Sequence, residues 1–198
     1  MSAIRLVLWL AVAAALGIAG LLAFNMVQQS RQSSTAQAPV LGSAFSLLDQ
    51  NGEFITERAF AGRPTALFFG FTQCPEICPV SLFEVSTLMD ELGNERRDLQ
   101  AFFISVDPVR DTPEVIRNYL APFSDNISGI TGDEAGIEAL AKSWGVFIKK
   151  VPLDDGDYTV DHTSSVYLVD RKGRFRGTIA YRENHATALE KLKLIINL

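Results

Sequence analysis

Two cysteines, Cys74 and Cys78, are the side chains of this sequence best suited to redox or metal chemistry. They are the only cysteines among 198 residues; three residues separate them and a proline follows each. Pro79 suits the first position of a helix, because proline lacks only an amide hydrogen that would be unpaired there. Cys78 is therefore expected at a helix N-terminus and Cys74 in the loop before it. The helix dipole then favours thiolate, the form that attacks disulfides and binds metals.

The spacing of the two cysteines leaves a redox pair and a metal site as alternatives. Thioredoxin-type dithiols usually have two residues between the cysteines, whereas here there are three. The added residue lets the sulfurs separate around an ion without preventing a disulfide. A structural zinc site of four thiolates is excluded, because no further cysteine is present. Soft thiolates in a site with few ligands favour copper, Cu(I) above all.

A third metal ligand has to come from elsewhere, and the sequence contains two histidines. His162 comes just before a predicted central strand, where a loop can meet the cysteine loop. It is therefore a candidate ligand, with a hydrogen-bonded structural histidine as the alternative. His185 is expected to be an ordinary residue at the start of the last helix.

The order of predicted elements indicates an α/β fold. Asn51-Gly52 is the centre of an expected hairpin. After it, strand patterns alternate with helix patterns. Strands are predicted over 64–71, 99–106, 146–151, 165–170 and 175–181, and helices over 80–92, from 111 onward, over 133–144 and over 186–196. Such alternation predicts a parallel or mixed sheet covered by helices. It fits a thioredoxin-like α/β sandwich with an added N-terminal hairpin, in which the cysteine loop follows the carboxyl end of a strand.

The N-terminal part of the sequence predicts a membrane anchor and a tether. Residues 6–24 contain no charged or strongly polar side chain, and 19 helical residues span roughly the ~30 Å hydrocarbon core. We expect an uncleaved transmembrane helix within 1–27, in preference to a cleaved signal peptide, whose apolar region is shorter. The Ser/Gln-rich residues 28–39 are expected to form a flexible linker, and 40–198 the folded domain.

Charge and orientation narrow the possible partners and the compartment. The net charge of -5 and the lack of a basic block exclude nucleic acid as an expected partner. An anchor with its N-terminus inside is the default for so short a leader, and it places the folded domain outside the cytoplasm. Because no Arg-rich mitochondrial presequence precedes the apolar run, we expect a bacterial inner membrane with the domain in the periplasm.

Four segments, in order, resemble the SCO/SenC family of copper-binding assembly factors for cytochrome c oxidase. They are FGFTQCPEICP (69–79), SVDPVRDTP (105–113), TGD (131–133) and DYTVDHTS (157–164). The resemblance implies a thioredoxin-like domain that holds one copper ion through Cys74, Cys78 and His162. It also implies delivery of that copper to the dinuclear copper centre of oxidase subunit II.

The leading hypothesis is thus a metallochaperone rather than an enzyme. It holds Cu(I) through both thiolates, and the histidine admits a Cu(II) form. Its expected partners are subunit II, an upstream copper donor and a thiol reductant, because the dithiol must be reduced before it takes up metal. The alternative is a thiol-disulfide oxidoreductase that uses the redox-active pair to reduce the acceptor's cysteines. A thiol peroxidase is disfavoured, because the expected Thr-x-x-Cys pattern does not precede Cys74.

Several residues near these motifs keep two interpretations. Asp161 is either a carboxylate that orients His162 or a solvated acid. Glu76 either tunes the charge near the thiols or meets a partner, or is simply solvent-exposed, which is the expected case. The group formed by Asp107, Arg110 and Asp111 belongs either to a partner surface or to loop hydrogen bonds and helix capping.

Overall fold

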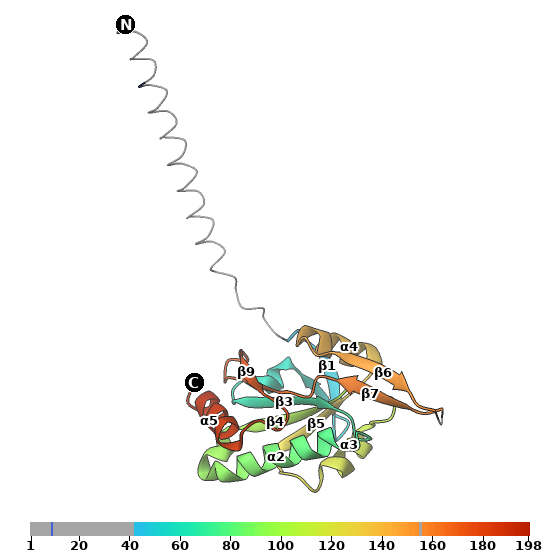
Figure 1. Cartoon of the computed structure of the whole chain (residues 1–198), viewed down its shortest axis with the longest axis horizontal. Coiled ribbons are helices and arrows are strands. Elements are labelled where there is room, and N and C mark those ends of the chain that lie inside the picture. Colours follow the sequence, from blue (N-terminus) through green and yellow to red (C-terminus); the bar gives the residue numbers. More distant parts are fainter. Residues whose placement is uncertain (1–8, 10–41, 155) are drawn as a thin grey trace. The chain divides into compact units, whose positions relative to one another are not determined.

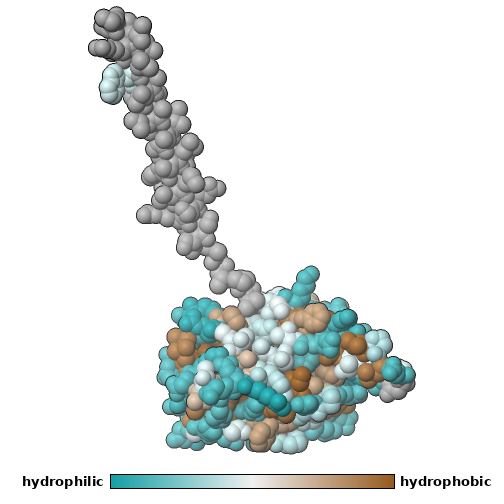
Figure 2. Space-filling model, in the orientation of Figure 1, coloured by the Kyte–Doolittle hydropathy of each residue, from teal (hydrophilic) through white to brown (hydrophobic). Residues whose placement is uncertain are grey.

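The computed structural model describes Trp9, residues 42–154 and residues 156–198. The predicted anchor and linker lie outside the described residues, apart from Trp9. Among the described residues, no helix is both long enough and apolar enough to cross a membrane. Contacts within the chain define a compact unit over Val40–Leu198. On its visible face, hydrophobic residues are scattered among hydrophilic ones (Figure 2).

A mixed sheet of seven strands forms the centre of this unit (Figure 1). In spatial order its strands are β2 (Phe54–Thr56), β1 (Ser46–Asp49), β5 (Ile127–Thr131), β4 (Gln100–Ser105), β3 (Thr65–Gly70), β8 (Val166–Val169) and β9 (Phe175–Ile179). Strands β3, β4 and β5 are parallel, and the remaining pairs are antiparallel. The expected mixed sheet and the expected N-terminal hairpin, β1–β2, are both confirmed.

Helices cover the two faces of the sheet. They are α2 (Ile77–Glu91), α3 (Pro113–Leu120), α4 (Glu134–Ser143) and α5 (His185–Ile196), with short 3-10 turns η1 (Glu57–Phe60) and η2 (Gly93–Asp98). On one face, Phe103 of β4 packs against Tyr119 of α3. On the other face, Phe102 contacts Phe60, which in turn contacts Trp144 at the end of α4. The fold is therefore the expected thioredoxin-like sandwich.

Strand β3 is central because its whole sequence is apolar or small. All six of its residues are buried, and neighbouring side chains point to opposite faces of the sheet. Phe68 contacts Phe103 on one face, while Phe69 contacts Tyr167 of β8. A strand buried on both faces needs such a continuous apolar run, and its carboxyl end carries the cysteine loop.

A separate two-stranded sheet lies beside the main one. Its strands are β6 (Ile148–Pro152) and β7 (Tyr158–His162), paired antiparallel with Ile148 opposite His162. The sequence interpretation found β6 but placed His162 in a loop, because polar residues interrupt the apolar pattern of β7. It also missed β5, which contains Gly129. A Cβ at Gly129 would lie 2.1 Å from Ile116 of α3, so this glycine permits helix α3 to approach the sheet.

The helix start at the cysteines differs from the prediction. Helix α2 begins at Ile77, so Pro79 is its third residue and not its first. The prediction of the first position was wrong, but the physical reason for it applies to the whole first turn, where the amide groups have no acceptor within the helix. Cys78 remains in this turn. The predicted start of α3 is confirmed: Thr112 accepts from the amide of Val115, and Pro113 is the first helical residue.

Candidate metal centre

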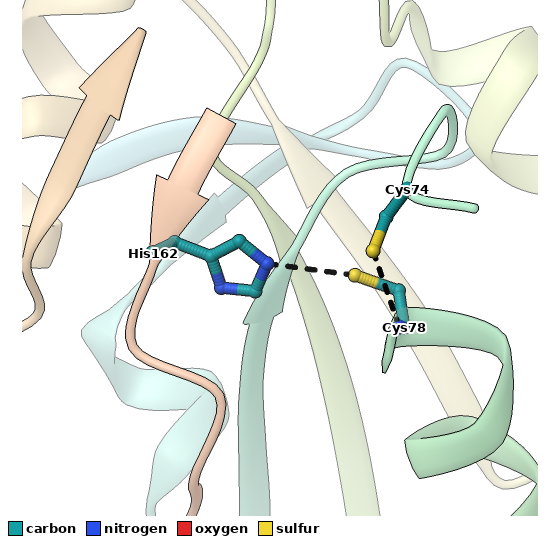
Figure 3. Close-up of side chains that lie close together, drawn as sticks. All are labelled: Cys74, Cys78 and His162. Carbon is teal, nitrogen blue, oxygen red and sulfur yellow. Dashed lines mark hydrogen bonds between the residues drawn. The ribbon is translucent and has the colours of Figure 1, made fainter. Parts of the chain in front are cut away.

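The three candidate ligands converge at the carboxyl end of β3 (Figure 3): Cys74, Cys78 and His162. Cys74 lies in the loop after β3, Cys78 in the first turn of α2, and His162 at the end of β7. Their ligand atoms all lie within 4.8 Å of one another. Among the described residues, no other group of three or more histidine, cysteine or acidic side chains has this geometry.

The two thiols are unpaired and differ in exposure. Both cysteines are free; Cys74 is 9% exposed and Cys78 is 0% exposed. The amide of Cys78 donates to Sγ of Cys74 over 3.3 Å. Sγ of Cys78 lies 3.6 Å from Nε2 of His162. Cys78 is therefore the more deeply buried of the two thiols, and its sulfur lies beside the imidazole of His162.

The two thiols share a proton unequally. The thiol of Cys78 donates to the sulfur of Cys74, and this is the main reason that the pKa of Cys74 falls to about 4. The imidazole of His162 lowers this pKa further, against the opposing effect of burial. The pKa of Cys78 is raised, because its proton is held by Cys74 and because the residue is buried. At neutral pH one thiolate is thus available before metal binding releases the second proton.

A backbone carbonyl orients His162. Its Nδ1 lies 3.0 Å from the carbonyl oxygen of Thr163, so Nδ1 donates to that oxygen and Nε2 is the ring nitrogen that faces the sulfurs and can serve as the metal ligand. The ring also packs edge-on against Phe71, at 5.8 Å between centroids. The side chain of Asp161 is exposed, and the oxygen that orients the histidine is that of Thr163.

Polar contacts from the 105–113 segment hold the strand that carries His162. Asp107 is 0% exposed and accepts from the hydroxyl of Tyr158 over 2.7 Å and from Nε of Arg110. Arg110 donates to the carbonyl of Tyr158 over 2.9 Å, and its guanidinium lies over the ring of Tyr158 at 3.8 Å. These residues form an internal clamp on β7, which we call the Asp107 clamp, and Asp107 is not part of the surface.

A second buried carboxylate holds the cysteine loop. Asp111 is 0% exposed and accepts from the amide and the hydroxyl of Thr72, at 3.0 and 2.6 Å, and from Ser105 at 2.6 Å. Burial raises the pKa of Asp111, and these three donors act against that rise. Asp111 therefore serves loop hydrogen bonding, as one of its two interpretations held, while the capping of α3 falls to Thr112.

The side chains of two further residues singled out in the sequence form ion pairs elsewhere on the surface. His185 is the first residue of α5, and its Nε2 lies 2.9 Å from a carboxylate oxygen of Glu91. Glu76 is exposed and pairs with Arg182 at 3.3 Å. His185 is thus the ordinary helix-start residue that we expected, and Glu76 is solvent-exposed, also as expected.

The donor set suits a soft metal ion. Two sulfurs and one imidazole nitrogen favour Cu(I) over hard cations, which prefer oxygen. An open groove of about 480 Å³ leads to Cys74 and His162, and its rim includes Pro75, Ile77 and Phe147. Cys78 does not line this groove. A metal ion held by these three residues would be reached through this groove, from the side of Cys74 and His162.

The tight packing under Cys78 includes a residue whose role the sequence interpretation missed. Gly70, the last residue of β3, lies directly beneath the sulfur: a Cβ added there would lie 2.9 Å from Sγ of Cys78. Tyr158 was missed in the same way, because a tyrosine at the start of a short strand resembles any half-buried aromatic residue. A glycine at the end of an otherwise bulky buried strand is the signal that could have identified Gly70.

Known proteins are similar to this chain in sequence and in fold. A protein of Rickettsia prowazekii, the SCO2-like protein RP587, is 39% identical over 137 residues, which are 68% of this chain and 67% of that protein. The human mitochondrial Protein SCO1 homolog is 39% identical over 140 residues, covering 69% of this chain and 46% of the human protein. The structure of Bradyrhizobium japonicum ScoI with copper bound matches 78% of this chain and 99% of its own, with 44% identity and a TM-score of 0.73.

A family match covers the whole folded unit. The model of the SCO1/SenC family matches residues 33–197, which include every described element and all three candidate ligands. The ordered motifs, the thioredoxin-like sandwich and the convergence of two cysteines with a histidine agree with that match. This chain belongs to the SCO1/SenC family.

Proposed function

We propose that this protein is a copper chaperone for the assembly of cytochrome c oxidase. One copper ion is held by Cys74, Cys78 and His162 and passed to the dinuclear copper centre of oxidase subunit II. The observation that carries the proposal is the convergence of these three ligand atoms within 4.8 Å, from parts of the chain that are 84 residues apart. Copper in the structure of the similar Bradyrhizobium protein supports the choice of metal.

Handover proceeds by exchange of ligands. Cysteine thiols of the acceptor enter through the open groove beside Cys74 and His162. Each bond between copper and a sulfur of this chain is replaced by a bond to a sulfur of the acceptor. Of the two protons that the acceptor's thiols lose, one returns to Cys78 and the other passes to solvent, because Cys74 remains a thiolate. No electron is transferred. Because Cys74 is the more exposed sulfur, it is exchanged before Cys78.

Copper titration tests this function. The reduced protein is titrated with Cu(I) against a competing chelator and then mixed with the metal-free soluble domain of an oxidase subunit II. We expect one copper per chain, and transfer of that copper to the acceptor after the two proteins are separated. Failure to bind copper stoichiometrically would overturn the proposal.

The same two sulfurs also favour a second function, thiol-disulfide exchange with the acceptor's cysteines. The observation in its favour is the unpaired dithiol, in which Cys74 has a lowered pKa. An attacking thiolate of Cys74 would form a mixed disulfide, which Cys78 resolves while the acceptor leaves as a dithiol. Oxidised acceptor domain, mixed with the reduced metal-free protein, tests this function by the number of acceptor thiols that appear.

The cellular setting is proposed from the sequence. We place the protein in a bacterial inner membrane through residues 6–24, with the copper-binding unit in the periplasm, where a thiol reductant keeps the dithiol reduced and an upstream donor supplies copper. Membrane fractionation of cells that express the full chain, followed by protease treatment of spheroplasts, tests this. Persistence of the folded unit in protease-treated spheroplasts would contradict the periplasmic placement.

A further inference from the structure

Gly70 occupies a position where a side chain has no room. A Cβ there would lie 2.9 Å from Sγ of Cys78, 2.8 Å from Cε2 of Phe103 and 3.2 Å from Cε1 of Phe68. Both phenylalanines are buried, at 0% and 3% exposure, and interiors packed at this density do not yield without cost. The thiol is the group that can rotate away.

The backbone does not explain this glycine. Gly70 is absent from the glycines with a positive φ, and it pairs with Ser105 in the regular parallel register of β3 and β4. Any L-residue can adopt this conformation. The missing side chain therefore matters for the space that it leaves, which the sulfur of Cys78 fills.

The position of that sulfur determines the geometry of the site. Sγ of Cys78 lies 3.6 Å from Nε2 of His162, and the Cys78 thiol donates to the sulfur of Cys74. A methyl group at position 70 would push this sulfur outward and change both separations at once. A metal site needs all three ligand atoms at bonding distance of one point, whereas a disulfide needs only two sulfurs whose side chains rotate toward each other.

We infer that Gly70 is a positioning residue for metal binding: its missing side chain holds the sulfur of Cys78 at the depth where it meets His162. The inference rests on the proposed function, because it concerns the same copper site. It also separates the two chemistries of the dithiol. Copper binding depends on Gly70, and disulfide formation does not.

The test compares Gly70→Ala with a matched glycine elsewhere. Gly132→Ala is the control, because a Cβ there would lie 2.6 Å from a methyl group of Leu47, and none of the three ligands is involved. We expect Gly70→Ala to bind Cu(I) at least about tenfold more weakly and to change the sulfur-to-copper charge-transfer band of the Cu(II) form. Its two thiols should still oxidise to a disulfide. Gly132→Ala should keep the copper affinity and the spectrum of the wild type, whatever its melting temperature.

A second variant covers the case in which Gly70→Ala fails to fold. Phe103→Leu removes the ring atom at 2.8 Å, so the double variant Gly70→Ala/Phe103→Leu retains the clash with Cys78 but not that with the ring. We expect Phe103→Leu alone to keep the copper spectrum and the double variant to lose it. Wild-type affinity and spectrum in Gly70→Ala, or in the folded double variant, would overturn the inference. If the wild type itself binds no copper, the proposed function is overturned. That result differs from the one that overturns the role of Gly70, in which the wild type binds copper and the variant binds it equally well.

Discussion

The two cysteines lie in the loop after β3 and in the first turn of α2, whereas His162 lies at the end of β7, in the separate two-stranded sheet. The cysteines are supported from below by Gly70 and by the buried side of α2, which includes Leu82 and Val85. Of the residues of strands β6 and β7, only Val160 is buried. The hairpin is held instead by the Asp107 clamp, that is, by hydrogen bonds to Tyr158.

The dithiol and the histidine therefore depend on different kinds of contact. Apolar packing positions the dithiol, so changes to the dithiol's support affect the core of the fold. Polar contacts position the histidine, so it can be displaced while the core remains intact. The two regions correspond to the two proposed chemistries: the dithiol serves both copper binding and thiol exchange, and the histidine serves copper alone.

The largest effect is expected from Cys78→Ser. This change removes the buried sulfur of the site, on which both chemistries depend, so both should be lost. Copper affinity should fall by roughly two to three orders of magnitude, given the free energy that a metal gains per ligand, and no intramolecular disulfide should form. Titration with Cu(I) and counting of thiols measure the two losses. Ser81→Ala is the control, because the buried hydroxyl of Ser81, one turn later in α2, has no hydrogen-bond partner among the residues that the structure describes. An equal loss in this control would point to damage of the helix.

His162→Ala should separate the two regions. It removes the nitrogen ligand from the hairpin and leaves the dithiol on the central sheet. We expect copper affinity to fall by about ten- to a hundredfold and the Cu(II) form to be lost, while the dithiol still reduces an oxidised acceptor. The control is His185→Ala, because His185 pairs with Glu91 on the surface; this variant should behave as the wild type. An unchanged Cu(II) spectrum in His162→Ala would contradict the assignment of the ligand.

Tyr158→Phe should weaken the clamp without touching a ligand. It removes the hydroxyl that donates to the buried Asp107 over 2.7 Å, and loss of a donor to a buried group costs about 1–3 kcal/mol. We expect copper affinity to fall by about tenfold, with disulfide formation unchanged. The control is Tyr181→Phe, because the buried hydroxyl of Tyr181 has no partner within the described part of the chain. Equal copper affinities of the two variants would show that the clamp does not position His162.

The smallest effect is expected in the pH dependence of the reactivity of Cys74, which should be nearly flat. The pKa of Cys74 is lowered to about 4, so in the reduced metal-free protein its thiolate is almost fully formed above about pH 6. The rate of alkylation of Cys74 by iodoacetamide should therefore stay nearly constant from pH 6 to pH 8, where an ordinary thiol gains about tenfold per pH unit. Mass spectrometry of the alkylated peptide measures it. A tenfold rise per unit at Cys74 would show that Cys78 does not donate to it.

Most of the central sheet could be predicted because its strands carry their own signal. The apolar run of β3 and the Asn-Gly turn between β1 and β2 are local patterns, and both elements formed where expected. Strands β5 and β7 could not be predicted in this way. Gly129 in β5 is a glycine because helix α3 packs closely against it, and β7 is held in place by the clamp on Tyr158. The residue patterns of both strands therefore depend on contacts with distant parts of the chain.

The sequence by itself determined the chemistry of the dithiol. Two cysteines separated by three residues, at the start of a helix, lie close together in any fold, because local geometry relates them. Only the tertiary structure decided the third ligand and its direction. His162 is 84 residues from Cys78. Its Nε2 faces the sulfurs because Nδ1 donates to the carbonyl of Thr163 and the Asp107 clamp holds β7. Such contacts join distant parts of the chain, and spacing along the sequence cannot encode them.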